Sequence, residues 1–159
     1  GPSTSPSRTA SSRGLRRVRH LQLSTEVSDV SGWTFAEIWE TAAAQRPDAP
    51  FAKQGSRTVT WSEAERRAEG LATFLLDRGA QRQDKVAQYL YNCPEYLESV
   101  FACYKAALVP VNTNYRYAAD ELVYLWDNAD AVAVIFHGIF ADTIEAIRER
   151  DAYFCEAIK

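Results

Sequence analysis

The sequence predicts an α/β fold in which a partial open parallel sheet is flanked by helices. From residue 85 onward, short apolar runs alternate with segments whose apolar residues recur every three or four positions, the order typical of strands joined by crossover helices. The run 131–136 is apolar throughout, as expected for a strand covered on both faces. With 159 residues, 47% hydrophobic and 25% charged, the chain is long enough for one such domain.

A leading helix and a small β-hairpin are expected before the alternating region. Thr34 and Glu37 have the spacing of a capping box, and Pro47 ends the helix. Two short strands at 51–53 and 58–61 then form the hairpin. The helix is expected to turn these residues inward: Phe35, Ile38, Trp39 and Ala42.

A second helix follows the hairpin. Its capping box is either Thr60 with Glu63 or Ser62 with Glu65, and the spacing does not choose between them. Gly79 stands where the residue after a helix C-cap belongs. Its inward positions are Ala64, Ala68, Leu71, Ala72 and Leu75. Acids at helical spacing are expected to form a solvated face: Glu63, Glu65 and Glu69.

Strands and helices alternate in the remainder of the body. The first strand mixes polar and apolar residues, so it is expected nearer an edge of the sheet. The helix after it is expected to turn Leu97, Val100, Phe101 and Tyr104 inward, with Asn92 as its N-cap rather than a ligand contact. The expected strands are 85–91, 108–113 and 131–136, and the expected helices are 92–107, 118–130 and 140–150.

Three parts are expected along the chain. Residues 1–31 form a basic tail rich in Ser and Arg, and its Gly-Pro start is typical of a tag-derived remnant. Residues 32–150 form the α/β body. In residues 151–159 a further apolar strand would be expected, but the apolar residues continue a helical spacing. We therefore predict a divergent, helical C-terminal tail.

Charge and composition exclude several classes of protein. The net charge is −3, and the arginines gather in the tail, so the acidic body does not favour nucleic-acid binding. No run reaches the roughly 18 apolar residues of a membrane span, although peripheral membrane contact stays open. The three Cys lack C-x-x-C spacing, which argues against a disulfide framework or a zinc site. Reduced thiols in a cytoplasmic protein are expected.

The candidate ligand-facing residues follow the strand at 108–113. Ligands of open parallel sheets bind beyond the carboxyl ends of the strands, where amides, a guanidinium and a phenol ring could contact a phosphate, a carboxylate or a flat ring. The alternative is a simple strand-to-helix turn, in which Asn is favoured for its backbone hydrogen bonds. The four residues are Asn112, Asn114, Tyr115 and Arg116.

No motif for phosphate binding or nucleophilic catalysis is visible. The seven glycines form neither G-x-G-x-x-G nor a P-loop, and no serine lies in a G-x-S-x-G elbow. His137 follows a strand and is interpreted as a surface or turn residue rather than a base. No catalytic, cofactor-binding or metal-ligating residue is therefore assigned.

Four stretches, taken in order, resemble the beginning of AMP-forming acyl-CoA synthetases, the fatty-acid–CoA ligase branch of the adenylate-forming enzymes. They are residues 35–52, 58–90, 92–117 and 119–136. The resemblance implies the Rossmann/flavodoxin-like half of an adenylate-forming N-terminal domain. It also implies a two-step reaction, in which a carboxylate such as a fatty acid and Mg-ATP form an acyl-adenylate and coenzyme A then displaces AMP.

The parts of the family that grip phosphate are not found in this sequence. The family's Thr/Ser/Gly-rich loop ending in Pro-Lys-Gly is missing, as is its catalytic lysine segment. The chain is therefore expected to be a truncated part of a ligase, inactive alone and needing no cofactor by itself. Two alternatives stay open: a binding or self-associating module with exposed apolar surface, and a small nucleotide binder that uses residues 112–117.

Overall fold

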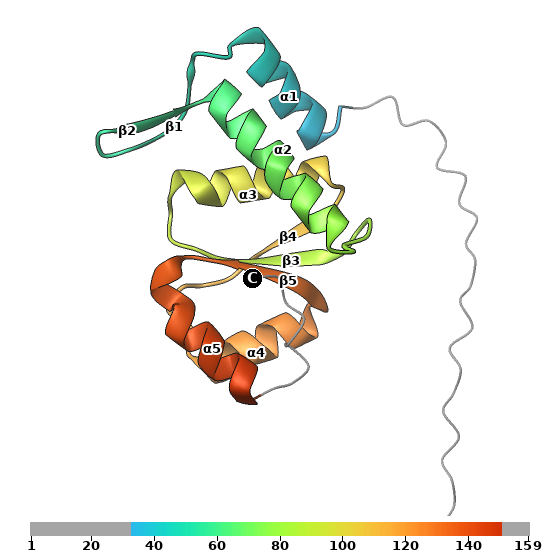
Figure 1. Ribbon diagram of the computed structural model, residues 1–159, viewed down its shortest axis with the longest axis vertical. Coiled ribbons are helices and arrows are strands. Elements are labelled where there is room, and N and C mark those ends of the chain that lie inside the picture. Colours follow the sequence, from blue (N-terminus) through green and yellow to red (C-terminus); the bar gives the residue numbers. More distant parts are fainter. Residues whose placement is uncertain (1–32, 151–159) are drawn as a thin grey trace, which may run out of the picture. The chain divides into compact units, whose positions relative to one another are not determined.

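A parallel sheet with helices on both faces forms the centre of the structure (Figure 1). The computed structural model describes residues 33–150. Within this range the sheet has the strand order β4-β3-β5, and β1 and β2 pair separately as an antiparallel hairpin. The elements are α1 (Phe35–Gln45), β1 (Pro50–Gln54), β2 (Arg57–Thr60), α2 (Trp61–Asp77), β3 (Lys85–Tyr89), α3 (Pro94–Lys105), β4 (Val109–Asn112), α4 (Ala119–Asn128), β5 (Ala131–Phe136), the 3-10 turn η1 (Gly138–Phe140) and α5 (Ala141–Arg150).

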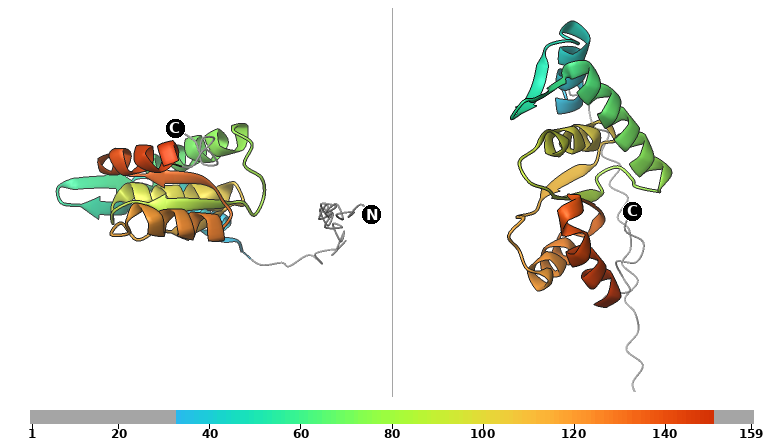
Figure 2. Two further views of the ribbon diagram at one scale, coloured as in Figure 1. Left: turned by 90° about the horizontal axis from the view of Figure 1, so that it is seen from below. Right: turned by 60° about the vertical axis from the view of Figure 1, so that its left-hand side comes forward.

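Two apolar cores lie on the two faces of this sheet. On one face, Val86 and Ala133 pack with α2 and α3 around the fully buried Phe101. On the other face, Ala87 and Val134 pack with α4 and α5. Figure 2 shows the resulting three layers, with α1, α2 and α3 on one side of the sheet and α4 and α5 on the other. The predicted α/β class, parallel pairing, leading helix and hairpin are thus confirmed.

The prediction that the first strand of the sheet lies near an edge is wrong. β3 is the central strand, paired in parallel with both neighbours. Its polar Gln88 is completely buried, because Ser99 of α3 donates a hydrogen bond to its Oε1 and its Nε2 lies 3.4 Å from Cys103 Sγ. A buried amide that is hydrogen-bonded within the core gives the same alternating pattern as a solvent-facing one.

The helix starts follow the predicted capping boxes. Thr34 and Glu37 cap α1 reciprocally, and the structure selects Thr60 with Glu63 for α2. Gly79 follows the α2 C-cap with φ +97, a conformation that glycine adopts at little steric cost. By contrast, the predicted N-cap of α3 is wrong: Cys93 takes that position, and Asn92 lies one residue earlier.

Several residues predicted to point inward are exposed, two of them on α1, which packs against α2 and α3. Phe35, Ile38 and Leu97 are 64%, 43% and 39% exposed. Phe35 instead stacks on Tyr104 at 5.3 Å between ring centroids. Trp39 is placed as predicted, because its ring meets the rings of Phe51, Trp61, Phe101 and Tyr104 and so joins α1 to the hairpin, α2 and α3.

The glutamates of α2 do not form a purely solvated face. Glu65 and Glu69 join Glu40 of α1 around the buried ammonium of Lys105. The Lys105 Nζ atom lies 2.7 Å from a carboxylate oxygen of Glu65, 3.0 Å from one of Glu69 and 2.7 Å from one of Glu40. Burial disfavours the charge of Lys105, but the hydrogen bonds that its ammonium donates to the three carboxylates outweigh this effect and raise its pKa. Glu63, the third predicted member, serves the capping box. Spacing along one helix could not reveal a cation supplied by another.

The described residues include no helix long and apolar enough to cross a membrane. Cys103 is buried and Cys93 is partly buried, both as free thiols, and burial raises the pKa of Cys103 to about 12. The basic tail, the helical C-terminal tail and Cys155 lie outside the described residues.

The hydrogen bond from Ser99 to Gln88 gives a stability prediction. We expect Ser99→Ala to lower the free energy of unfolding by about 2 kcal/mol, because it leaves the buried amide oxygen without a donor. Urea titration followed by circular dichroism measures the change. Ser56→Ala in the exposed hairpin turn is the matched control, and an equal, small effect of both substitutions would contradict the role given to Ser99.

Candidate functional site

The strands β3 and β5 lie side by side, but the chain leaves them toward opposite faces of the sheet. After β3 it enters α3, which packs on one core, and after β5 it enters η1 and α5, which pack on the other. In open α/β sheets, ligands bind in the crevice beyond the carboxyl ends of strands whose connections diverge in this way. The segments that follow β3 and β5 therefore form the candidate ligand site.

A hollow of about 490 Å³ lies at this position. We call it the switch-point hollow. Leu90 and Tyr91 line it after β3, and His137 and Gly138 line it after β5. The hairpin extends on the side of the sheet where these strands end (Figure 1). It supplies another wall, and the start of α3 completes the lining: Gln54, Arg57, Cys93 and Glu95.

Aromatic rings gather around Tyr91 at this end of the sheet. Its ring centroid lies 4.9 Å from that of Tyr115, 5.1 Å from Phe140 and 5.6 Å from His137. Behind them the buried Tyr89 stacks on Phe140 at 4.2 Å, and burial raises the pKa of its phenol. Tyr91 is 36% exposed, so the cluster presents ring surface to solvent on a packed support.

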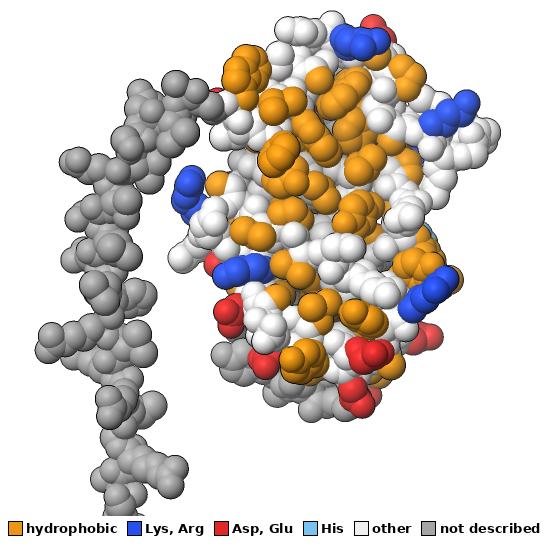
Figure 3. All heavy atoms as spheres, turned by 180° about the vertical axis from the view of Figure 1, so that it is seen from behind, with side chains coloured by type: hydrophobic (Ala, Val, Ile, Leu, Met, Phe, Trp, Pro, Cys, Tyr) orange, Lys and Arg blue, Asp and Glu red, His pale blue; other side chains and the backbone are white. Residues whose placement is uncertain are grey.

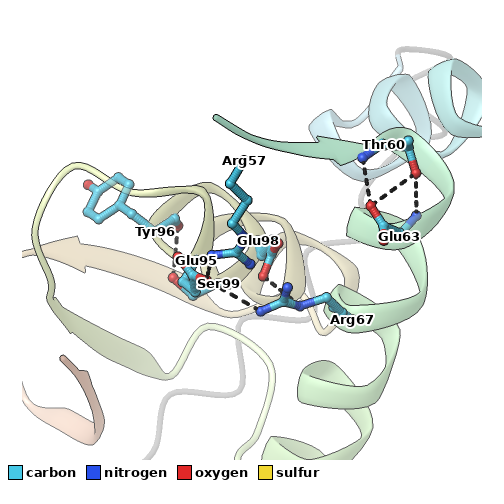
Figure 4. Close-up of polar contacts among 8 residues, drawn as sticks. All are labelled: Arg57, Thr60, Glu63, Arg67, Glu95, Tyr96, Glu98 and Ser99. Atoms are coloured by element: carbon cyan, nitrogen blue, oxygen red, sulfur yellow. Dashed lines mark hydrogen bonds and ion pairs between the residues drawn. The ribbon is translucent and has the colours of Figure 1, made fainter. Parts of the chain in front are cut away.

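Charged side chains connect the hairpin and α2 to the first turns of α3 (Figure 4). Arg57 Nη1 of β2 donates to Glu95 Oε1 at 2.5 Å. Arg67 of α2 reaches both acids, with Nη2 at 3.6 Å from Glu95 and Nε at 3.0 Å from Glu98. The Gln54 side chain also donates to the Asn92 carbonyl at 3.2 Å. These contacts hold the hairpin against the start of α3.

The two acids of this network differ in their electrostatics. Burial tends to raise the pKa of Glu95, but hydrogen bonds from Arg57 and other donors outweigh it and hold that pKa below its usual value. Glu98 is 5% exposed, and here burial outweighs the attraction of Arg67 and raises the pKa. Within residues 33–150, Glu98 Oε1 has no hydrogen-bond partner, which is consistent with an unfavourable buried charge.

The four residues predicted as ligand-facing are exposed at the end of β4, as expected from the sequence. Asn114 Oδ1 accepts from the backbone N–H of Arg116 at 3.0 Å, which is the geometry of an Asx turn. Arg116 lies over the Tyr115 ring at 5.5 Å. Only Tyr115 reaches the aromatic cluster around Tyr91. The turn interpretation accounts for Asn114, and a ligand contact by Asn112 or Arg116 stays a prediction.

Reasoning from the sequence missed Arg57 of the hairpin, and it interpreted residues 91–95 as a helix start rather than a ligand site. The hairpin lies more than thirty positions before α3 in the chain, and no spacing indicates that the two meet. Gly138 and His137 could have been found, because they directly follow an apolar strand in a parallel sheet. Among the described residues, no cluster of His, Cys, Asp and Glu could hold a metal ion.

A comparison with known families decides the kinship of the chain. Residues 39–156 match the AMP-binding enzyme family. The chain belongs to the AMP-binding enzyme family. This match covers most of the chain, and it confirms the resemblance to the N-terminal part of acyl-CoA synthetases.

Relatives of this chain include CoA ligases. A 3-oxocholest-4-en-26-oate–CoA ligase of Rhodococcus rhodochrous is 35% identical over 109 residues, which cover 69% of the chain and 20% of that ligase. A medium/long-chain-fatty-acid–CoA/3-oxocholest-4-en-26-oate–CoA ligase of Mycobacterium tuberculosis is 36% identical over the same length. The matched region spans about a fifth of these relatives.

Solved structures of CoA ligases share the fold. A putative long-chain-fatty-acid CoA ligase from Rhodopseudomonas palustris aligns with a TM-score of 0.69 at 26% identity, over 76% of this chain and 30% of that one. A benzoate CoA ligase from Burkholderia xenovorans aligns at 0.70 and 20% identity, over 76% and 24%. The N-terminal domain of FACL13 from Mycobacterium tuberculosis aligns at 0.69 and 24% identity, over 74% and 30%. The sheet and helices described above are therefore those of an adenylate-forming N-terminal domain.

The opposite pKa shifts of Glu98 and Glu95 predict opposite effects of amide substitution. A raised folded-state pKa means that stability is lost as the pH rises through the unfolded value toward the folded one, and Glu98→Gln removes that loss. At pH 7 we expect the free energy of unfolding of the Glu98→Gln variant to equal or exceed that of the parent chain. Near pH 4, the difference in free energy between the variant and the parent should be smaller.

Glu95→Gln is the matched comparison. A lowered folded-state pKa means that the Glu95 charge stabilises the fold above its unfolded pKa and that this benefit disappears in acid. Glu95 is partly exposed, so the loss at pH 7 should stay within about 1 kcal/mol. Urea unfolding at both pH values measures these effects. Equal destabilisation by the two substitutions at pH 7 would contradict the assigned difference.

Proposed function

We propose that this chain supplies the N-terminal portion of an ATP-dependent fatty-acid–CoA ligase. In the complete reaction a carboxylate attacks the α-phosphate of Mg-ATP, pyrophosphate leaves, and the thiol of coenzyme A displaces AMP from the acyl-adenylate. The observation that carries the proposal is the family match over residues 39–156, together with the CoA-ligase relatives. The relatives' names support a fatty or sterol-derived acid as substrate.

We further propose that the chain alone does not catalyse this reaction. Transfer at phosphorus requires donors and a cation that neutralise the triphosphate. The family's Pro-Lys-Gly loop does not occur in the sequence. Residues 32–150 then form the folded ligase portion of a cytoplasmic chain, which takes no cofactor by itself, while ATP, Mg²⁺ and coenzyme A serve the complete ligase.

A chimera tests the ligase kinship, and the isolated chain tests its inactivity. We expect residues 39–150, exchanged for the matched segment of the Mycobacterium tuberculosis ligase, to retain measurable acyl-CoA formation, because the two segments are 36% identical over 109 residues. The same ligase with the segment deleted is the control. The isolated chain with ATP, Mg²⁺, a fatty acid and coenzyme A should release no AMP above background. A chimera that folds without activity opposes the kinship, and AMP release by the chain overturns its inactivity.

A second candidate function is a non-enzymatic module that associates with its own copies. Hydrophobic side chains occupy much of the face shown in Figure 3. Large apolar residues of the described part are well exposed, including Trp33, Tyr124 and Ile139 at 70%, 73% and 66%. Exposed apolar area on this scale favours a covering partner, and a second copy of the chain is the simplest one.

Sedimentation velocity over a wide concentration range tests this candidate. We expect the average mass to rise above the 17.9 kDa of one chain as the concentration increases, because association buries apolar surface. The rise should persist in high salt, which weakens ionic contacts between exposed groups. A single monomeric species at the highest concentration would contradict self-association.

A further inference from the structure

The two outer strands of the parallel sheet differ in how well their free edges are protected against pairing. The sheet has the order β4-β3-β5, so β4 and β5 each have one edge that no other strand of the described residues occupies. An open edge presents a row of unpaired backbone N–H and C=O groups, which can template pairing with another chain. The hydrogen bonds to β3 show which residues contribute to each row.

The free edge of β4 is protected by a proline. The N–H group of Val109 donates to the carbonyl of Asp84 at 2.8 Å. The N–H group of Thr113 donates to the carbonyl of Gln88 at 3.2 Å. Because backbone groups alternate in direction along a strand, Pro110 faces the outer edge. Proline has no N–H group to donate, so its presence opposes the addition of another strand at this edge.

The free edge of β5 has no such protection. The N–H group of His137 donates to the carbonyl of Tyr89 at 3.1 Å. By the same alternation, the backbone groups of Val134 and Phe136 point outward. The strand Ala131–Phe136 contains no proline and no charged residue. Short uncharged segments rich in β-branched and aromatic residues are typical of strands that pair with copies of themselves.

A second copy of the chain fits this edge. In an antiparallel pairing about a two-fold axis, Val134 of each copy lies opposite Phe136 of the other, and each such pair exchanges two N–H···O=C bonds. Asp130 and His137 flank the strand. Antiparallel pairing places Asp130 of one copy at the end where the other copy has His137, so the two aspartates stay apart. Val132, which is 43% exposed, lies in the strand that the second copy would cover.

We infer that two copies of the chain associate by antiparallel pairing of their β5 edges, which joins their two sheets into one continuous sheet. The inference rests on the self-association proposed above as the second candidate function, and it names the contact through which the copies meet. Ile139, one of the exposed apolar residues that favour self-association, lies just after β5.

Backbone hydrogen exchange of the ¹⁵N-labelled chain at increasing concentration tests the contact. We expect the amides of Val134 and Phe136 to exchange about tenfold more slowly once about nine-tenths of the chains are paired, because exchange then requires dissociation. The amide of Asn112, on the outer edge of β4, is the internal control and should keep its rate. Sedimentation velocity of the same samples gives the paired fraction.

The two measurements separate the contact from association itself. Association without slower exchange at Val134 and Phe136 would overturn the β5 contact and leave self-association standing. A monomer at every concentration would overturn both.

Charged substitutions give an independent test of the contact. We expect Val132→Lys to weaken association about tenfold, because lysine on an edge strand opposes pairing. Tyr124→Lys on α4, where the side chain is 73% exposed, is the matched control and should leave association unchanged. Retained dispersion of the amide spectrum shows that each variant folds. A greater loss of association with Tyr124→Lys than with Val132→Lys would place the contact on the helices and overturn the inference.

Discussion

The rest of the structure depends on the burial of both faces of β3. The strand pairs in parallel with β4 and β5, and its side chains alternate between two separate cores. Parallel strands require crossover connections, so each neighbour brings a helix that must cover one face. Gln88 is the single polar side chain in the buried stretch of this strand, and its hydrogen bonds with α3 make its burial tolerable. Without them, the amide would oppose the packing of α3 on the sheet.

The same topology creates a hollow that a hairpin, a helix start and two strand ends line together. Because α3 and α5 lie on opposite faces, the segments after β3 and β5 separate and leave space between them. The hairpin closes one side through Arg57, and Glu95 joins it to α3. A local rule about sheet connections thus positions groups that lie more than thirty residues apart in the chain.

Ion pairs join the helices in the layer of α1, α2 and α3. Lys105 meets carboxylates from two helices, and Arg67 meets two acids of a third. Such networks contribute little net stability when desolvation is counted. They do favour the arrangement of the helices in which the charges are paired. Apolar contacts alone would specify this arrangement less well.

The sequence by itself determined the class of the fold, the capping of α1, the limits of β5 and the kinship with acyl-CoA ligases. These features depend on local spacing, on turn chemistry and on motif order, all of which act between near neighbours. Only the tertiary structure decided that β3 is central, that Leu97 faces solvent and that Lys105 gathers the glutamates of α1 and α2. It also decided that Arg57 meets Glu95 beside Tyr91. Each of these results depends on which distant segments come into contact, and residue spacing within one element carries no information about that contact.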